Sequence, residues 1–452
     1  MMKIPGSIHA RSFGVKLIVV CGLAVPMSVP ALFVGGLIQE RTRRAAEVVR
    51  QISGYSGGQQ TFLGPTLVVP YRVAADSMRG PYVVFPSAAT AVVRTKTEER
   101  RRSLFRVPVF QADLSFEATF DLAGTPSALP SGMEMDWNLA EIVVGVSDVR
   151  GALEDATLAT GGKVMPLIPA QAQTGIALGS EQNGQIKLTL LGTRIEGIAK
   201  PNGKFQVSAE MRFSGAQRLA ILSYGNRTQV SAQGDWPSPG FDGGFLPIRR
   251  TITKNAYTAE WSIPFIARGV RAEGPLQSIA GLENTALGTS FIEVADPYQS
   301  VNRCLKYVPL FLGMVFLCYF VLEVATGRRI HPAQYILVGV VQIIFYLLLL
   351  SLAERIGFDG AFAVAGAATV ALLSTNAAWV FASRREGLRA MVTFTVLYVV
   401  IFVLLRAEDY ALLIGAIASF LVVAVTMYLT RRVDWHSPLP AEDSGGPAER
   451  AA

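Results

Sequence analysis

Four acidic residues in the C-terminal third lie in two short polar stretches between long apolar runs. Glu354 and Asp359 occupy the first stretch, and Glu408 and Asp409 occupy the second. Two carboxylates that converge beside a cleft can act as a general acid and base, and acids among apolar helices can hold an ion or relay a proton. A simple turn in solvent has the same local appearance. The chemistry open to these acids therefore depends on the segments around them.

The composition separates an apolar part of the chain from a part that resembles a soluble domain. The 452 residues are 17% charged, whereas typical soluble domains are roughly 25% charged. Apolar runs of bilayer length recur over 307–429, but not over 39–306. The net charge of +7 is not gathered in one patch, because the basic run "RTKTEERRR" (94–102) also holds acids and is expected to be a solvated loop. We therefore expect a membrane protein and no nucleic-acid partner.

Six segments are predicted to cross a bilayer, since each is close to the ~20 residues that a membrane helix needs. The first, 13–38, is longer than the apolar region of a cleaved signal peptide and is expected to be an uncleaved signal anchor. The other five, joined by short connections, are expected to form a bundle at about 307–325, 333–352, 361–382, 390–405 and 411–429.

The charges of the short loops predict the orientation of these segments. Loops with seven arginines in total alternate with loops that hold two arginines and the four acids. The arginine-rich loops are 326–332, 383–389 and 430–435, and the acidic loops are 353–360 and 406–410. Because Lys and Arg of short loops collect on the cytoplasmic side, both termini (1–12 and 430–452) are predicted to be cytoplasmic, with disorder after about 436. The domain 39–306 is then periplasmic, and the four acids lie in outward-facing turns that could cluster.

The exported domain is predicted to be rich in β-strands. After a charged helical stalk at 39–50, short stretches rich in Val, Phe, Thr and Tyr are bounded by Gly, Pro, Asn or Asp. Such stretches are typical of strands, and "DLSFEATF" (113–120) alternates as a strand with one buried face does. Residues 139–148 fit either a short helix or a strand, and 150–185 carry no clear pattern.

The predicted fold class is thus a membrane protein of α + β type. It combines an N-terminal signal-anchor helix, a large exported, mostly antiparallel β domain similar to a sandwich, and a C-terminal bundle of five transmembrane helices.

The sequence contains no familiar motif for a cofactor or a metal. The three histidines have no paired spacing, the three cysteines form no CxxC pair, and Walker A and GxGxxG patterns are missing. We therefore expect no cofactor, no metal site and no catalytic residue, and predict that the protein is not an enzyme.

One aromatic cluster could contact a ligand. Trp236, Phe241 and Phe245 lie among glycines and prolines in "GDWPSPGFDGGFLP" (234–247). They could form a platform for sugar rings such as those of peptidoglycan, or they could cover the end of a sandwich.

Four polar residues fall within the predicted membrane helices. Glu323 precedes Arg328 by five residues, which favours an ion pair near the interface. Gln342, Tyr346 and Asn376 could line a solute pathway, although such side chains more often tie helices together.

Several short blocks occur in order along the chain and resemble the CreD family of bacterial inner-membrane proteins. They are "FLGPTLVVPY" (62–71), "GGFLPIRRTIT" (243–253), "DPYQSVNRCLKYVPLF" (296–311), "HPAQYILVG" (331–339), "FYLLLLSLAERIGF" (345–358), "EDYALLIG" (408–415) and "TRRVDW" (430–435). The similarity extends from about Tyr55 to Trp435 and is strongest after 290. The resemblance implies a part in cell-envelope integrity, in some bacteria as a response under a two-component regulator, and it carries over no site residues.

The expected function is therefore a non-enzymatic one at the inner membrane. Its partners would be the lipid bilayer and, for the periplasmic domain, peptidoglycan or an envelope protein. Two alternatives remain open. A transporter or channel would need a polar cavity joining Gln342, Tyr346 and Asn376, and an envelope enzyme would need the outer-loop acids to converge.

Overall fold

The chain divides into two compact units in its computed structural model. One, the helical unit, comprises Met1–Arg44 and Ala295–Ala452, and the other, the β unit, comprises Ala45–Val294. The structure describes residues 13–431 except for 74–75, 103–104, 127–132, 172, 174, 180–184, 196–202, 292–300, 302–303, 306, 327–329 and 407–410.

A single long helix, α1 (Phe13–Tyr55), covers both the predicted anchor and the predicted stalk. Its 43 residues correspond to a length of about 64 Å at 1.5 Å per residue. Pro26 and Pro30 lie inside it without ending it. Beyond residue 44, Val49 and Ile52 pack against Val107 and Val109, so the last turns of the helix belong to the β unit.

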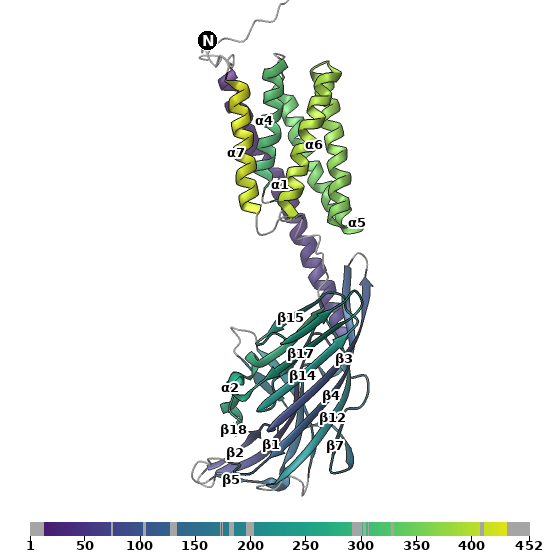
Figure 1. Cartoon of the computed structure of the whole chain (residues 1–452), viewed down its shortest axis with the longest axis vertical. Helices are drawn as coiled ribbons and strands as arrows, with labels where there is room; N and C mark the ends of the chain where they lie inside the picture. Colours follow the sequence, from purple (N-terminus) through teal and green to yellow (C-terminus); the bar gives the residue numbers. More distant parts are fainter. Residues whose placement is uncertain are drawn as a thin grey trace, which may run out of the picture. The chain divides into compact units, whose positions relative to one another are not determined.

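The β unit consists of two sheets over the described residues (Figure 1). The first sheet has the order β10 (Gly175–Leu178), β11 (Ile186–Arg194), β6 (Glu141–Val146), β1 (Gln60–Val73), β13 (Arg218–Leu222), β19 (Ala286–Phe291) and β15 (Pro239–Gly243). Attached to it are β2 (Asp76–Val84), β5 (Met133–Met135), β9 (Ile168–Pro169) and β18 (Glu273–Pro275).

The second sheet has the order β16 (Arg249–Ile252), β17 (Tyr257–Ile263), β14 (Arg227–Gly234), β3 (Ala88–Arg102), β4 (Phe105–Asp121), β12 (Lys204–Ala216), β7 (Thr157–Thr160) and β8 (Lys163–Pro166). The described pairings are antiparallel except for β1 with β13 and β3 with β14, which are parallel. Short helical turns connect some of the strands: η1 (Trp137–Leu139), η2 (Val149–Gly151), α2 (Phe265–Arg268), η3 (Leu276–Ile279) and η4 (Leu282–Thr285).

The two sheets share one apolar core, which the alternation of β4 illustrates. Leu114, Phe116, Ala118 and Phe120 are at most 2% exposed, whereas the residues that alternate with them reach solvent more freely. Across the core, the rings of Phe62 in β1 and Phe213 in β12 meet edge to face with centroids 5.4 Å apart. The period-two pattern of this segment therefore correctly indicates one buried face.

Three segments differ from, or go beyond, their sequence patterns. The charged run 94–102 is the end of strand β3 and not a loop, because it pairs with β4 as far as Arg102 opposite Phe105. Residues 139–148 form the end of η1 and then strand β6. The unassigned stretch 150–185 contributes the short strands β7, β8, β9 and β10.

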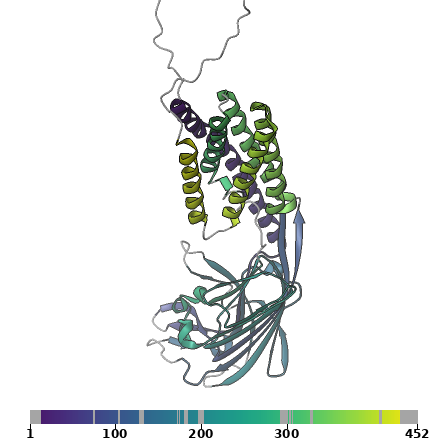
Figure 2. The ribbon, with the colours of Figure 1, turned by 45° about the horizontal axis from the view of Figure 1, so that its top comes forward.

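The C-terminal helices lie side by side in the helical unit (Figures 1 and 2). They are α4 (Val308–Thr326), α5 (Pro332–Val380), α6 (Arg384–Arg406) and α7 (Ala411–Thr430). Helix α5 starts with Pro332 after His331, whose Nδ1 accepts the amide hydrogen of Ala333 at 3.2 Å. Among the described residues, α5 and α6 are long and apolar enough to cross a bilayer, and 308–324 forms a shorter apolar helix.

Helix α5 folds back on itself at Gly357. The rings of Phe345 and Phe362 have centroids 5.6 Å apart, although seventeen residues of straight helix would separate them by about 25 Å. Gly357 has φ 76° and ψ 168°, a conformation open almost only to glycine. The two arms of the hairpin coincide with the segments predicted at 333–352 and 361–382.

Candidate functional site

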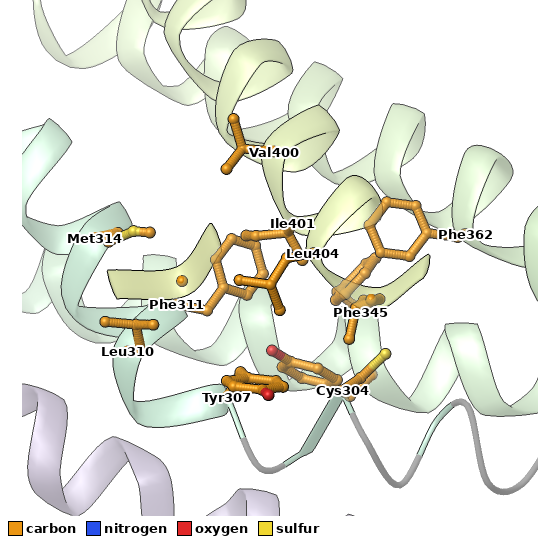
Figure 3. A pocket seen from close by; sticks show the side chains of 13 residues that line it. Cys304, Tyr307, Leu310, Phe311, Met314, Phe345, Phe362, Val400, Ile401 and Leu404 are labelled. Atoms are coloured by element: carbon orange, nitrogen blue, oxygen red, sulfur yellow. The ribbon is translucent and has the colours of Figure 1, made fainter. Parts of the chain in front are cut away.

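An aromatic cluster joins the helices at one end of the helical unit (Figure 3). The ring of Phe311 in α4 lies 5.0 Å from that of Tyr398 in α6, and Phe345 in α5 lies 5.2 Å from the same tyrosine. Phe362, on the second arm of α5, completes the group. Edge-to-face contacts of this kind stabilise packing beyond the area that they bury.

A small cavity lies within this cluster, with Cys304 and Tyr307 at its border (Figure 3). Its volume is about 20 Å³, which is room for roughly one water molecule. The lining is almost wholly apolar and includes Tyr346, which is 3% exposed. A void of this size and character gives no support to a solute path through Tyr346.

The other polar residues predicted within the membrane make hydrogen bonds between helices. The hydroxyl of Tyr398 donates to Gln342 Oε1 at 3.1 Å, and Asn376 Nδ2 donates to the Tyr319 oxygen at 3.3 Å. Neither Gln342 nor Asn376 lines either of the two cavities described in the helical unit. The arrangement ties helices together.

Glu323 is buried, with only 2% of its surface exposed. Its Oε2 accepts a hydrogen bond from the Tyr335 hydroxyl at 2.8 Å, and its Oε1 accepts one from the Ile330 amide at 3.0 Å. These two donors offset part of the cost of burying a carboxylate. The predicted partner, Arg328, lies outside the described residues.

The acids of the acidic loops are matched to arginines where the structure describes them. Glu354 lies 3.7 Å from Arg41 of α1, and Asp359 pairs with Arg406 at the end of α6. Glu408 and Asp409 lie outside the described residues. Glu354 and Asp359 thus have separate cationic partners, an arrangement suited to holding helix ends together.

The three candidate aromatic side chains of the β unit pack into its core. Trp236 is 9% exposed and meets Phe291 edge to face at 6.3 Å. Phe241 contacts Trp261 at 5.8 Å, and the indole nitrogen of that tryptophan donates to the carbonyl oxygen of Phe245 at 3.1 Å. Trp236 is thus part of the core, and Phe241 and Phe245 are partly buried against it.

Arg268 is a buried cation that the sequence pattern did not single out. It is 3% exposed, donates from Nε to the Ser223 carbonyl at 3.0 Å and lies over the ring of Phe85. Burial lowers the pKa of its guanidinium to about 10. No sequence signal marks it, because a lone arginine after a strand is ordinarily exposed.

A comparison with known families covers nearly the whole chain: the family model described as "Inner membrane protein CreD" matches residues 12–436. The chain belongs to the CreD family. This CreD-family protein is also similar to the inner membrane protein CreD of Escherichia coli (strain K12). The two are 26% identical over 438 residues, which cover 93% of each chain.

Membership in this family places the protein in the inner membrane and makes the lipid bilayer its immediate surroundings. Exposed apolar side chains on the helices, such as Leu32, Phe33 and Val396, are then expected to face lipid. The helical unit of this CreD-family protein also contains three hydrogen-bonded tyrosines that the sequence pattern did not single out: Tyr319, Tyr335 and Tyr398. Their signal in the sequence is faint, since tyrosine is also common at membrane interfaces.

In the described part of this CreD-family protein, no group of three or more His, Cys, Asp or Glu side chains is arranged to hold a metal ion.

Proposed function

We propose that this CreD-family protein supports the integrity of the cell envelope as a non-catalytic membrane protein whose β unit faces the periplasm and binds an extended segment of an envelope protein. The observation that carries the proposal is the outer edge of strand β16. This strand ends the second sheet, with β17 on one side and no described strand on the other.

Strand β16 and the residues before it expose apolar side chains. Leu246 is 68% exposed, Ile248 is 61% exposed and Ile252 is 46% exposed. Proteins usually protect such an edge with charge or cover, because it can template pairing with another strand. An exposed apolar edge is therefore suited to strand addition, in which backbone hydrogen bonds give affinity and alternate side chains give specificity.

The helical unit supports a role as an anchor and not as a catalyst. Gln342 and Asn376 each make a hydrogen bond to another helix, and Glu354 and Asp359 have arginine partners. Neither described cavity joins Gln342 to Asn376, as a transport path through those residues would require.

Complementation of a deletion strain under envelope stress tests the proposal. The strain would be challenged with cell-wall antibiotics and detergent, and rescued with the full chain or with variants. We expect Leu246→Lys with Ile252→Lys to fold but to rescue poorly, because charges on an edge oppose strand addition. The matched control is Val149→Lys with Leu153→Lys, which changes two exposed apolar residues outside the strands, 39% and 44% exposed.

Three results would overturn the proposal. The deletion could leave envelope resistance unchanged, or the two lysine pairs could rescue equally well. Alternatively, Glu354→Gln could abolish rescue in a protein of unchanged thermal stability, which would favour an envelope enzyme instead.

A further inference from the structure

An open groove runs between the second arm of α5 and helix α6, with a volume of about 440 Å³. It is far larger than the aromatic cavity, and the two linings share Phe362. Small residues of α5, among them Ala363, Ala367 and Ala371, line one side, and Met391 and Val399 of α6 stand on the other.

The groove exists because the α5 side chains along it are short. The three alanines recur every four residues and thus share one face of the helix. They are exposed, as are Met391 at 44% and Val399 at 55%. Where the helices approach, Gly366 lies so close to Tyr398 that an added Cβ would be 3.3 Å from the ring. The hollow therefore opens outward, toward the surroundings of the unit.

Its length matches one leaflet of a bilayer. From Asp359 at one end to Ala371 at the other, twelve residues of helix span about 18 Å. Half of a hydrocarbon core is about 15 Å. An extended acyl chain of one leaflet therefore has the length that the groove can cover.

One end of the groove is charged. Asp359 lines it, and the carboxylate pairs with Arg406, whose guanidinium can reach the same end. Both side chains remain accessible, at 54% for Asp359 and 59% for Arg406. A polar end with both signs of charge above an apolar channel is complementary to a zwitterionic amphiphile. A packed helix would instead cover this ion pair and remove it from water at a cost.

We propose that this groove binds one phospholipid whose headgroup carries an amine. One acyl chain lies along the alanine face, the phosphate accepts hydrogen bonds from Arg406, and the ammonium donates to Asp359. Guanidinium and phosphate form a strong charge-assisted contact, and the carboxylate distinguishes an ammonium headgroup from an anionic one. The binding is independent of the edge strand β16 and of which side of the membrane the groove faces.

Native mass spectrometry of the full chain in mild detergent tests this site, with phosphatidylethanolamine and phosphatidylglycerol titrated in competition. We expect the wild-type protein to retain one phosphatidylethanolamine in preference to phosphatidylglycerol. Ala367→Phe fills the groove and should abolish this binding. The control is Ala368→Phe, which changes the neighbouring exposed alanine outside the groove lining and should leave it intact.

The headgroup contacts are tested in the same titration. Arg406→Gln should lower the affinity for both lipids about tenfold, which is the effect of losing one charge-assisted hydrogen bond. Asp359→Asn should remove the preference for phosphatidylethanolamine and leave the binding of phosphatidylglycerol unchanged. Thermal unfolding of each variant verifies that it is folded.

Other outcomes would overturn the proposal. Ala367→Phe and Ala368→Phe could reduce lipid binding equally, which would indicate a general lipid annulus. The wild type could show no headgroup preference. Finally, Ala367→Phe could convert a dimer into a monomer without changing lipid binding, which would assign the groove to a second copy of the chain.

Discussion

The hydroxyl of Tyr335 donates a 2.8 Å hydrogen bond to the carboxylate of Glu323, and both side chains are at most 2% exposed. The bond joins the C-terminal half of α4 to the first turn of α5. An acid in this position is costly among apolar helices, and each donor that reaches it lowers that cost. The pair therefore links the stability of the helical unit to a single phenol group.

Tyr335→Phe should destabilise the helical unit. The change removes the hydroxyl and keeps the ring, so the loss is that of a buried hydrogen bond to an acid, about 1–3 kcal/mol. Thermal unfolding in detergent measures it, with Tyr428→Phe as the control because Tyr428 is 62% exposed. Equal melting temperatures for the two variants would show that this hydrogen bond does not stabilise the helical unit.

The hairpin of α5 predicts a sharp contrast between two neighbouring glycines. Gly357 has a φ of 76° and should not tolerate a side chain, so Gly357→Ala should cost about 1–3 kcal/mol. Gly360 is helical, and a Cβ there would meet only Ile356 at ordinary distances of 3.4 Å or more. Gly360→Ala should therefore be neutral or slightly stabilising. The comparison uses the same thermal unfolding assay, and the reverse order of stability would contradict the hairpin geometry.

The aromatic cluster predicts a large cost for removing its central ring. Phe311 contacts Phe345, Tyr346 and Tyr398, and Phe311→Ala should cost about 3–5 kcal/mol because a cavity remains. Phe420→Ala is the control, since Phe420 is 74% exposed. Resistance to proteolysis in detergent reports both effects. A Phe311→Ala protein as resistant as the control would show that the cluster packs less tightly than its geometry indicates.

Only part of this architecture could be predicted from the sequence. Strand β4 was predictable because its apolar residues alternate between core and solvent. Strand β6 was ambiguous because all six of its residues are buried, which removes the alternation. Seven of the nine residues in 94–102 are charged, and only the long-range pairing of this run with β4 makes it a strand.

The candidate site in the helical unit was likewise only partly predictable from the sequence. Apolar runs and loop charges mark the helices, but not the contacts that hold their polar residues. Arg41 and Glu354 are brought within 3.7 Å although 313 positions separate them, and no local pattern signals that pair. The groove beside α6 depends on the side-chain sizes of two helices at once, so a hydropathy profile cannot reveal it.

In the β unit, the Tyr257 hydroxyl should lose its proton at a higher pH than an ordinary tyrosine does. Burial raises its pKa to about 12, although the hydrogen bond between its hydroxyl and the Thr95 hydroxyl at 2.9 Å acts in the opposite direction. The unfolded chain releases this proton near pH 10 and the folded chain near pH 12, so the stabilisation is complete below pH 10 and is lost as the pH rises through about 12. Ultraviolet titration of wild type minus Tyr257→Phe measures the midpoint. A value near 10 would mean that the phenol is not buried as described.

The orientation of the β unit is the last prediction, and the periplasmic binding proposal depends on it. Single cysteines at Ser87 and Ser383, in a background without Cys21, Cys304 and Cys318, would be tested in intact cells with a membrane-impermeant thiol reagent. We expect Ser87→Cys to react and Ser383→Cys to react only after permeabilisation, because Ser383 directly precedes the arginine-rich start of α6. If Ser383→Cys reacted in intact cells and Ser87→Cys did not, the β unit would be cytoplasmic. Strand β16 could then meet no envelope protein, whereas the phospholipid groove, which requires only a bilayer, would remain open to the lipid titration.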